Sequence, residues 1–303
     1  MLSKVFNGIA FLPPRGELEE GSGRARGARG GAEGLYIIMR IVLIGAGNLA
    51  TNLGKALKKA GHDILQVYSR TASSAETLAT VLGCPATTDL TAIDNRADVY
   101  ILSIKDKVLR EVIAELTRAL TSSGTDLSEK IFLHTAGSMP LEVFKDNAPH
   151  YGVFYPMQTF SKAREVDFSV IPTFIEWNDE TAHTLLTALA QSVTRRVYPL
   201  STADRKYLHL SAVWACNFVN HCYDIAAEIL AAHHLPFDVM LPLIDETARK
   251  VHTLSPHNAQ TGPAVRYDEN VIAAQSALLA ADPNLQQLYE LLSKSIHRHA
   301  KNR

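Results

Sequence analysis

The chain has 303 residues, of which 47% are hydrophobic and 20% are charged, and its formal net charge at pH 7 is −1. This length and composition suffice for two packed domains, and the charge balance excludes a strongly basic nucleic-acid-binding protein. No apolar run is long enough to cross a membrane. Three cysteines without a Cys-x-x-Cys pair predict a reducing, cytoplasmic location without disulfides. We therefore expect neither nucleic acid nor a membrane as a partner.

The first 38 residues differ in composition from the rest. Residues 21–31 are rich in glycine and arginine and show no hydrophobic periodicity. Such a segment cannot bury enough apolar surface to fold, so we expect residues 1–38 to be a disordered or non-native extension. Met39 stands immediately before the first predicted strand, and we expect it to be the true initiator.

A glycine motif follows the first predicted strand. Residues 41–44 are apolar and mostly β-branched, as in a buried parallel strand, and a helix is expected at 49–60. Gly45 permits the sharp turn out of the strand, and Gly47 lets a pyrophosphate approach the backbone. Ala50 stands where a third glycine is usual, and its methyl group still allows close packing of helix and strand. The positive end of the helix would face the phosphates.

The second predicted strand, at 63–68, indicates which dinucleotide is bound. An NAD site would place Asp or Glu after this strand, to accept hydrogen bonds from the ribose hydroxyls. The chain has Ser69, Arg70 and Thr71 instead, and a guanidinium with two hydroxyls suits a 2′-phosphate. This predicts NADP as the cofactor. The alternative is that Arg70 is a solvated turn residue.

Strands and helices continue to alternate as far as residue 200. Alternation predicts an α/β domain over 39–200, a Rossmann-type doubly wound parallel sheet that binds ligands at the carboxyl ends of its strands. We expect further strands at 98–104, 131–135, 151–154, 169–175 and 193–199, and helices at 73–82, 108–120 and 179–192. Residues at the carboxyl ends of these strands are then expected along the cofactor crevice: Ser103, Ile104, Lys105, His134, Thr135, Ala136 and Ser138.

A polar loop at 155–160 contains a rigid proline. It is either an ordinary connection or a wall of the substrate site, facing the crevice. In the second interpretation Gln158 and Thr159 contact the substrate.

No strand pattern follows Leu200, which predicts an all-α domain over 201–303. The expected helices are 203–230, 236–253, 267–280 and 283–299.

One face of the helix expected at 203–230 is polar. At 100° per residue its polar arc is roughly 80° wide, and it contains Lys206, His209, Val213, Asn217, Asn220 and Asp224. The apolar residues on the other faces suggest a helix that is buried on more than one side. Asn217 would then orient a substrate carbonyl, and Lys206 or His209 would donate a proton. The alternative is a solvated polar face.

Arg266 follows a Gly-Pro turn at 262–263. It would hold a substrate carboxylate in a bidentate pair, or form a structural ion pair with Asp268. No histidine or cysteine cluster has the spacing of a metal site, so no metal is expected.

Several of these stretches together resemble a two-domain Rossmann-like family whose C-terminal half is catalogued as a domain of unknown function, DUF2520. They are the motifs at 44–50, 69–70, 134–138 and 156–160, His209 with Asn217, and 261–264 with Arg266 and Asp268. The family is similar to pyrroline-5-carboxylate reductase, to deazaflavin-dependent NADP oxidoreductases and to ketopantoate reductase. The resemblance covers nearly all of the chain from Met39 onward.

This resemblance implies an NADP-binding domain, an α-helical dimerisation domain and a site between them. It implies a homodimer and a small-molecule substrate, and some relatives act as alternative ketopantoate reductases. By position, the cofactor motif is matched by Gly45, Gly47, Asn48, Leu49, Ala50, Ser69 and Arg70, and the family's helical His and Asn by His209 and Asn217. Tyr267 replaces a common glycine, which leaves the substrate open.

We therefore predict an NADP-dependent oxidoreductase that reduces a small carbonyl or imine compound. The nicotinamide is expected near Ser103, His134 and Ala136. The rival from another class is a non-catalytic NADP-binding sensor or scaffold, since one fold serves both. A reductase acting on a cyclic imine is a further alternative. Only an enzyme requires a proton donor within reach of the nicotinamide.

Overall fold

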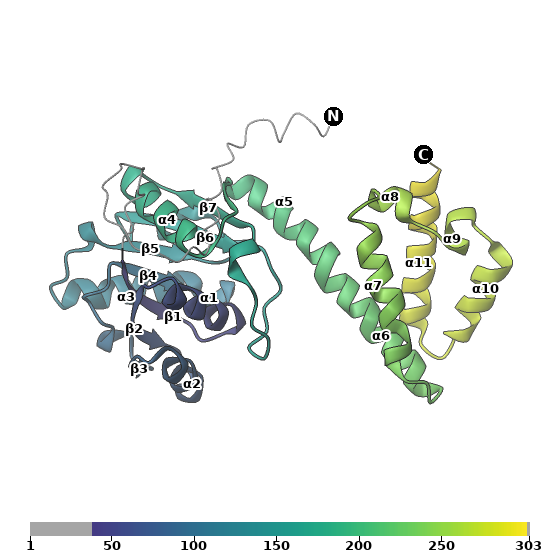
Figure 1. Ribbon diagram of the computed structural model, residues 1–303, viewed down its shortest axis with the longest axis horizontal. Helices are drawn as coiled ribbons and strands as arrows, with labels where there is room; N and C mark the ends of the chain where they lie inside the picture. Colours follow the sequence, from purple (N-terminus) through teal and green to yellow (C-terminus); the bar gives the residue numbers. More distant parts are fainter. Residues whose placement is uncertain (1–37, 302–303) are drawn as a thin grey trace, which may run out of the picture. The chain divides into compact units, whose positions relative to one another are not determined.

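The computed structural model describes residues 38–301, so the predictions for residues 1–37 lie outside it (Figure 1). The chain divides into two compact units, with the boundary between Val219 and Asn220. The domain boundary expected from the sequence, at residue 200, stays a prediction. The division into compact units lies further along, so that the first turns of the long helix belong to the same unit as the sheet.

The first unit is built on an eight-stranded sheet. The strands are β1 (Arg40–Ile44), β2 (Asp63–Tyr68), β3 (Ala86–Thr87), β4 (Val99–Leu102), β5 (Ile131–His134), β6 (His150–Pro156), β7 (Thr173–Trp177) and β8 (Val197–Pro199). Their order is β3-β2-β1-β4-β5-β6-β7-β8, so β8 is the edge strand that the sequence predicts at 193–199. Because β1 lies between β2 and β4, the strand order reverses there, and this is where a doubly wound sheet forms its ligand crevice. The α/β fold is confirmed.

One pair in the sheet departs from the parallel prediction. Strand β7 runs antiparallel to β6, with Phe154 opposite Ile175. The connection at 157–172 has no α-helix, only the 3-10 turn η5 (Phe168–Val170), whereas the crossover between parallel neighbours is usually an α-helix. The strand expected at 169–175 begins only at Thr173.

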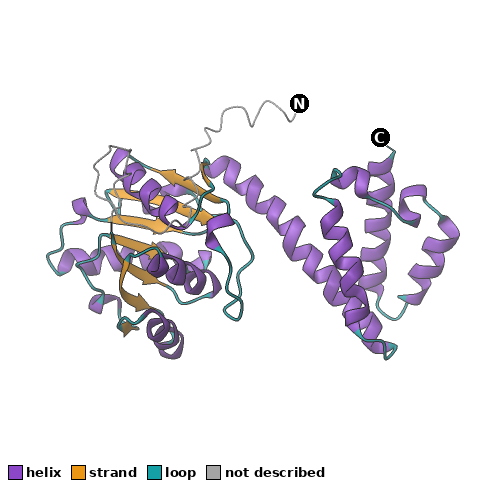
Figure 2. Ribbon diagram, viewed as in Figure 1, coloured by secondary structure: helices purple, strands orange, loops and turns teal. Residues whose placement is uncertain are grey.

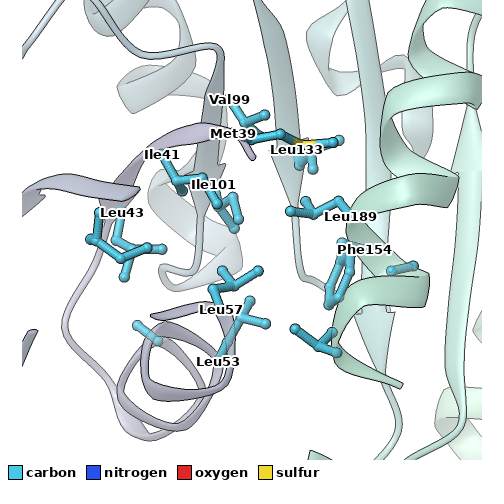
Figure 3. Packing of buried hydrophobic residues seen from close by; sticks show 14 of the residues in the cluster. Met39, Ile41, Leu43, Leu53, Leu57, Val99, Ile101, Leu133, Phe154 and Leu189 are labelled. Carbon is cyan, nitrogen blue, oxygen red and sulfur yellow. The ribbon is translucent and has the colours of Figure 1, made fainter. Parts of the chain in front are cut away.

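Helices cover both faces of this sheet and create two hydrophobic cores. They are α1 (Asn48–Lys59), α2 (Ala72–Leu82), α3 (Asp106–Ser122) and α4 (Glu180–Val193). Alternate residues of β1 enter the two cores, with Leu43 in the first and Val42 in the second. Figure 3 shows the first core, where Leu53 and Leu57 of α1 and Leu189 of α4 pack against the strands. Each such fully buried side chain contributes roughly 1.5–3 kcal/mol.

The second unit contains helices and, within the residues described, no strand, which confirms the all-α prediction (Figure 2). Its elements are α6 (Val219–Ala232), η7 (Phe237–Met240), α7 (Leu241–Lys250), α8 (Pro256–Ala259), α9 (Pro263–Arg266), α10 (Glu269–Leu278) and α11 (Pro283–Ala300). The short helices α8 and α9 were not predicted, because a single turn carries no periodicity. Among its described residues, the side chains classed as buried are Ala264, Ser276 and Ser293.

Residues 202–232 are helical throughout, as expected, but the helix is not uniform. It comprises α5 (Thr202–Ala212), the π-helical turn η6 (Val213–Phe218) and α6. Ser201 caps its start, since its hydroxyl accepts a hydrogen bond from the Asp204 amide. The expectation that this helix is buried on several sides is wrong for the single chain, because Tyr207 is 73% exposed and Trp214 is 59% exposed.

None of the helices within residues 38–301 combines the length and the hydropathy needed to cross a membrane.

Candidate functional site

The turn after β1 requires glycine at one position and leaves another open. Gly45 has φ +118°, and a Cβ there would collide with the carbonyl oxygen of Ser103 at the end of β4. Gly47 is the N-cap of α1, and a Cβ there would meet no protein atom within 4 Å. Packing therefore explains Gly45 but not Gly47. At Gly47 the missing side chain leaves room for an external group beside the free amides of the helix N-terminus.

A pocket of about 550 Å³ lies at the carboxyl ends of β1, β2, β4 and β5. Twelve of the predicted cofactor residues line it: Gly45, Gly47, Asn48, Leu49, Ser69, Arg70, Thr71, Ser103, Ile104, Lys105, Thr135 and Ala136. Two predicted residues do not line it. Ala50 is fully buried in the core, and His134 is buried beneath the loop that follows β5. Ser138 also lies outside the pocket lining.

The pocket carries more cationic than anionic side chains. Arg70, Lys105 and Lys162 line it, and within the described chain none of the three forms an ion pair. The one acidic lining residue, Asp106, accepts a hydrogen bond from the hydroxyl of Ser138. Unpaired cations beside free helix amides fit the phosphates of a dinucleotide. Lys162 was missed in the sequence because it lies two residues beyond the motif at 156–160.

His134 supports the loop after β5. Its Nδ1 accepts a hydrogen bond from the Ala136 amide at 3.1 Å, so Nε2 carries the proton and donates to the carbonyl oxygen of Pro140. Burial, with the nearby charge of Arg205, lowers the pKa of His134 to about 3. A neutral, doubly hydrogen-bonded ring holds the backbone that presents Ala136 to the pocket.

A second pocket of about 510 Å³ lies in the same unit, between the loop after β6 and the long helix. The loop contributes Gln158 and Thr159, and the helix contributes His209 and Asn217. The structure thus brings together four of the six residues predicted to act on the substrate. Tyr155 also lines this pocket. It was expected at the start of the polar loop and was assigned no role, whereas the structure places it in β6.

His209 has a defined environment in this pocket. The hydroxyl of Tyr155 lies 3.0 Å from its Nδ1, and the two rings meet edge to face. A Cβ added at Gly137 would lie 2.5 Å from Nδ1 and 2.7 Å from Cγ of His209. Any residue larger than glycine at position 137 would therefore overlap the imidazole ring of His209.

The π turn explains how His209 and Asn217 come to share one pocket. A π turn holds roughly one residue more than an α turn, so one α turn and one π turn together span about eight residues. His209 and Asn217 are eight residues apart and flank the start of this turn. Sequence periodicity assumes a uniform helix and placed them at opposite sides of the polar arc.

The other two predicted residues lie elsewhere. Lys206 is exposed on α5 and does not line the second pocket. Arg266 belongs to the second unit, where its guanidinium pairs with the carboxylate of Asp268 at 2.8 Å. That ion pair is the alternative that the sequence left open for this arginine.

A buried arginine, which was not singled out from the sequence, anchors the start of the long helix. Arg205 is 1% exposed, pairs with Glu176 of β7 and donates to the carbonyl oxygen of Met139 at 2.6 Å. It is thereby fixed to both the sheet and the loop after β5. This network positions α5, and with it His209 one turn further along.

Two chain segments connect the two pockets. After β5, Ala136 lines the first pocket and Gly137 backs onto His209 in the second. In the loop after β6, Thr159 lines the second pocket and Lys162 lines the first. The amide of Asn52 in α1 holds this loop, since Nδ2 donates to the carbonyl oxygen of Ser161 at 3.0 Å.

Two family descriptions match the chain. "NADP oxidoreductase coenzyme F420-dependent" matches residues 40–125, and "Domain of unknown function (DUF2520)" matches residues 171–296. The first match covers β1 to α3, which build much of the first pocket. The second covers β7 to α11, including the helix that carries His209 and Asn217.

Solved structures resemble the whole described chain. A "putative NADP oxidoreductase" from Bacteroides fragilis is 54% identical, with a TM-score of 0.82, over 86% of this chain and 98% of that one. An imine reductase from Myxococcus stipitatus in complex with NADP+ is 15% identical, with a TM-score of 0.59, over 87% of this chain and 93% of that one. The second likeness concerns the fold alone.

Curated relatives match over a shorter length. Glycerol-3-phosphate dehydrogenase [NAD(P)+] of Staphylococcus aureus is 27% identical over 119 residues. The match covers 35% of this chain and 34% of the relative, so the chain matches about a third of that enzyme's length.

Proposed function

The chain belongs to the two-domain Rossmann-like family that joins an NADP oxidoreductase domain to a DUF2520 domain, and from this membership we propose that it is an NADPH-dependent reductase. Its substrate is a small carbonyl or imine metabolite, and 2-ketopantoate is the first candidate. The observation that carries the proposal is the connection of the two pockets through residues 135–137 and 158–162.

The first pocket fits NADP. The open space beside Gly47 and the uncapped N-terminus of α1 would receive the pyrophosphate. Arg70, with Ser69 and Thr71, would hold the 2′-phosphate, and Lys105 and Lys162 add positive charge at the same pocket. The bound cofactor supplies a hydride.

The second pocket supplies the polar groups that a carbonyl or imine reduction needs. The carboxamide of Asn217 would donate a hydrogen bond that orients the substrate. Hydride addition to the carbon leaves a basic oxygen or nitrogen, which takes a proton from the protein to give the alcohol or amine. His209 or Lys206 would donate this proton. His209 lines the pocket, which favours it over Lys206.

We also propose that the chain acts as a homodimer. The second unit exposes apolar side chains on α7, α10 and α11 and just after α7: Leu241, Leu243, Val251, Leu278, Leu291 and Leu292. An apolar surface of this extent is typical of a face that another chain covers. A second copy is the occupant that the family's α-helical dimerisation domain implies.

NADPH consumption tests the reaction. Purified protein is mixed with NADPH and, in turn, with 2-ketopantoate, other 2-keto acids and cyclic imines. We expect turnover with one of them, and we expect Asn217→Ala and His209→Ala to lower kcat by about 10²–10⁴-fold with little change in NADPH affinity. Lys206→Ala is the comparison that identifies the proton donor.

The same experiment distinguishes the rival function. Tight NADPH binding with no turnover of any compound would favour an NADP-binding sensor or scaffold. Full turnover in all three alanine variants would instead show that the helix carries no catalytic side chain.

A further inference from the structure

We propose that Tyr155 is a positioning residue, which fixes His209 in the tautomer that presents Nε2–H to the second pocket. This inference rests on the proposed reductase function and identifies which residue donates to the substrate. It is carried by the contact between the Tyr155 hydroxyl and Nδ1 of His209, by the burial of Tyr155, and by the position of Gly137.

The direction of the hydrogen bond follows from the partners of Tyr155. This side chain is only 8% exposed, and among the described residues its hydroxyl has one hydrogen-bond partner, Nδ1 of His209. If Nδ1 carried a proton and donated it, the phenol proton would have no acceptor in the described part of the chain, and an unsatisfied buried donor costs about 1–3 kcal/mol. The phenol therefore donates, and Nδ1 is the acceptor. Burial also raises the pKa of Tyr155, which keeps the phenol protonated.

An imidazole that accepts at Nδ1 carries its proton at Nε2 when it is neutral. Gly137 approaches the ring from the Nδ1 and Cγ side, at 2.5 and 2.7 Å from an added Cβ. Tyr155 and Gly137 thus occupy one edge of the ring. The opposite edge, with Nε2, has no hydrogen-bond partner in the part of the chain described, and the residue lines the pocket.

This arrangement separates His209 from Lys206. A fixed imidazole N–H aimed at the pocket polarises a carbonyl or imine without reorganisation when the hydride arrives. The basic oxygen or nitrogen that forms takes the Nε2 proton, and water returns a proton to the ring. Lys206 is exposed, and nothing in the described structure fixes its ammonium group. The positive charge of Arg205, on the same helix as His209, opposes part of the rise in the pKa of Tyr155. The ion pair of Arg205 with Glu176 of β7 fixes α5 against the sheet, and this keeps His209 within reach of Tyr155.

Nitrogen-15 NMR of the histidine rings tests the tautomer without any substrate. The signals of His209 are assigned by their loss in His209→Gln. We expect a single tautomer at neutral pH, with Nε2 protonated and Nδ1 unprotonated. We expect Tyr155→Phe, which removes only the hydroxyl, to produce the mixture of tautomers of a free side chain. Gly137→Ala should displace the ring and change the same signals.

Kinetics then tests whether the contact acts through His209. Tyr155→Phe should lower kcat roughly 3- to 10-fold, the loss expected for one hydrogen bond, with the NADPH dissociation constant unchanged. In the His209→Gln background the same substitution should cause no further loss. Tyr151→Phe is the matched control, because Tyr151 lies on the same strand and its hydroxyl has no partner within residues 38–301.

Two results would overturn the inference. One is protonation of Nδ1, or a tautomer mixture, in the wild-type protein. The other is an equal loss from Tyr155→Phe with and without His209. If no compound is reduced by the wild-type protein, the proposed function fails, but the NMR spectra still decide whether Tyr155 sets the tautomer.

Discussion

The two units of this chain bury their apolar residues to very different extents. The first unit encloses two cores, one on each face of its sheet, with Leu53, Ile101 and Phe132 fully buried. In the described part of the second unit, Ala264 is the one apolar residue classed as buried. A helical unit of this size cannot be stabilised by so little burial. The first unit therefore accounts for its own stability, whereas the second requires surface from elsewhere.

The two units also differ in the arginines that were predicted to bind ligands. Arg70 lines the first pocket without an ion-pair partner in the described chain, whereas Arg266 is already paired with Asp268. Both proposed pockets lie in the first unit. The comparison thus supports two proposals, that the first unit binds the ligands and that the second forms the contact between copies of the chain.

The largest effect is expected in the core of the first unit. Phe132 is fully buried and stacks on Tyr100 with ring centroids 5.1 Å apart. Phe132→Ala should lower the free energy of unfolding by about 3–5 kcal/mol, because it leaves a cavity. Urea denaturation measures this, and the loss should not vary with protein concentration. A loss that grew on dilution would place this core at an interface.

A smaller, concentration-dependent effect is expected in the second unit. Leu243 of α7 is 62% exposed, and Leu243→Glu should weaken the dimer by roughly 2–4 kcal/mol if a second copy buries it. Sedimentation equilibrium measures the change. Val81→Glu, an exposed position on α2 of the first unit, is the control and should leave the oligomeric state unchanged. A wild-type protein that is monomeric would contradict the proposal that a second copy covers the apolar faces of the second unit.

The cofactor provides the next test. Arg70→Ala should raise the dissociation constant of NADPH about 10- to 100-fold, the loss of a charge-assisted hydrogen bond, and affect NADH much less. Arg266→Ala is the matched variant in the second unit and should leave both constants unchanged. Isothermal titration calorimetry separates the four cases. Equal losses for NADPH and NADH would mean that Arg70 does not contact the 2′-phosphate.

The effect expected to be smallest, when counted per pH unit, concerns the pH dependence of stability. The pKa of His134 is lowered to about 3 by burial, whereas an unfolded histidine has its ordinary value near 6.5. The unfolded chain therefore binds one more proton between these values, and stability falls as pH decreases from about 6.5, by up to ~1.4 kcal/mol per pH unit. His134→Gln should remove this contribution from the pH dependence of urea denaturation. An unchanged slope would assign the effect to another group, such as His62.

Much of the first unit could be predicted from the sequence, because its signals are local. The apolar run at 41–44 and Gly45 specify a strand and a turn whatever the rest of the chain does. The loop with Gln158 and Thr159 was predicted to face a substrate site, and in the structure both residues line the same pocket as His209. Their contact with a substrate stays a prediction. The use of Tyr155 and Gly137 was not predictable, because it depends on contacts between residues more than fifty positions apart.

The second unit shows where sequence reasoning stops. Hydrophobic periodicity located its helices but could not show that their apolar faces stay uncovered in one chain. The π turn at Val213–Phe218 also escaped, because one extra residue in a turn changes the face of Asn217 without changing composition. The antiparallel pairing of β7 was also not predicted, because the alternation of strands and helices suggests helical crossovers and the connection from β6 to β7 contains no α-helix.

The loop after β6 has a kinetic consequence. It places Lys162 at the first pocket and Gln158 and Thr159 at the second, and Asn52 fastens it to the helix that begins at the phosphate turn. A nucleotide phosphate bound to Lys162 would therefore hold the loop in place, and with it the side of the second pocket that contacts the substrate. We expect a compulsory order of addition, with the nucleotide entering first and leaving last. Oxidised nucleotide should then inhibit competitively against NADPH, and the reduced product noncompetitively.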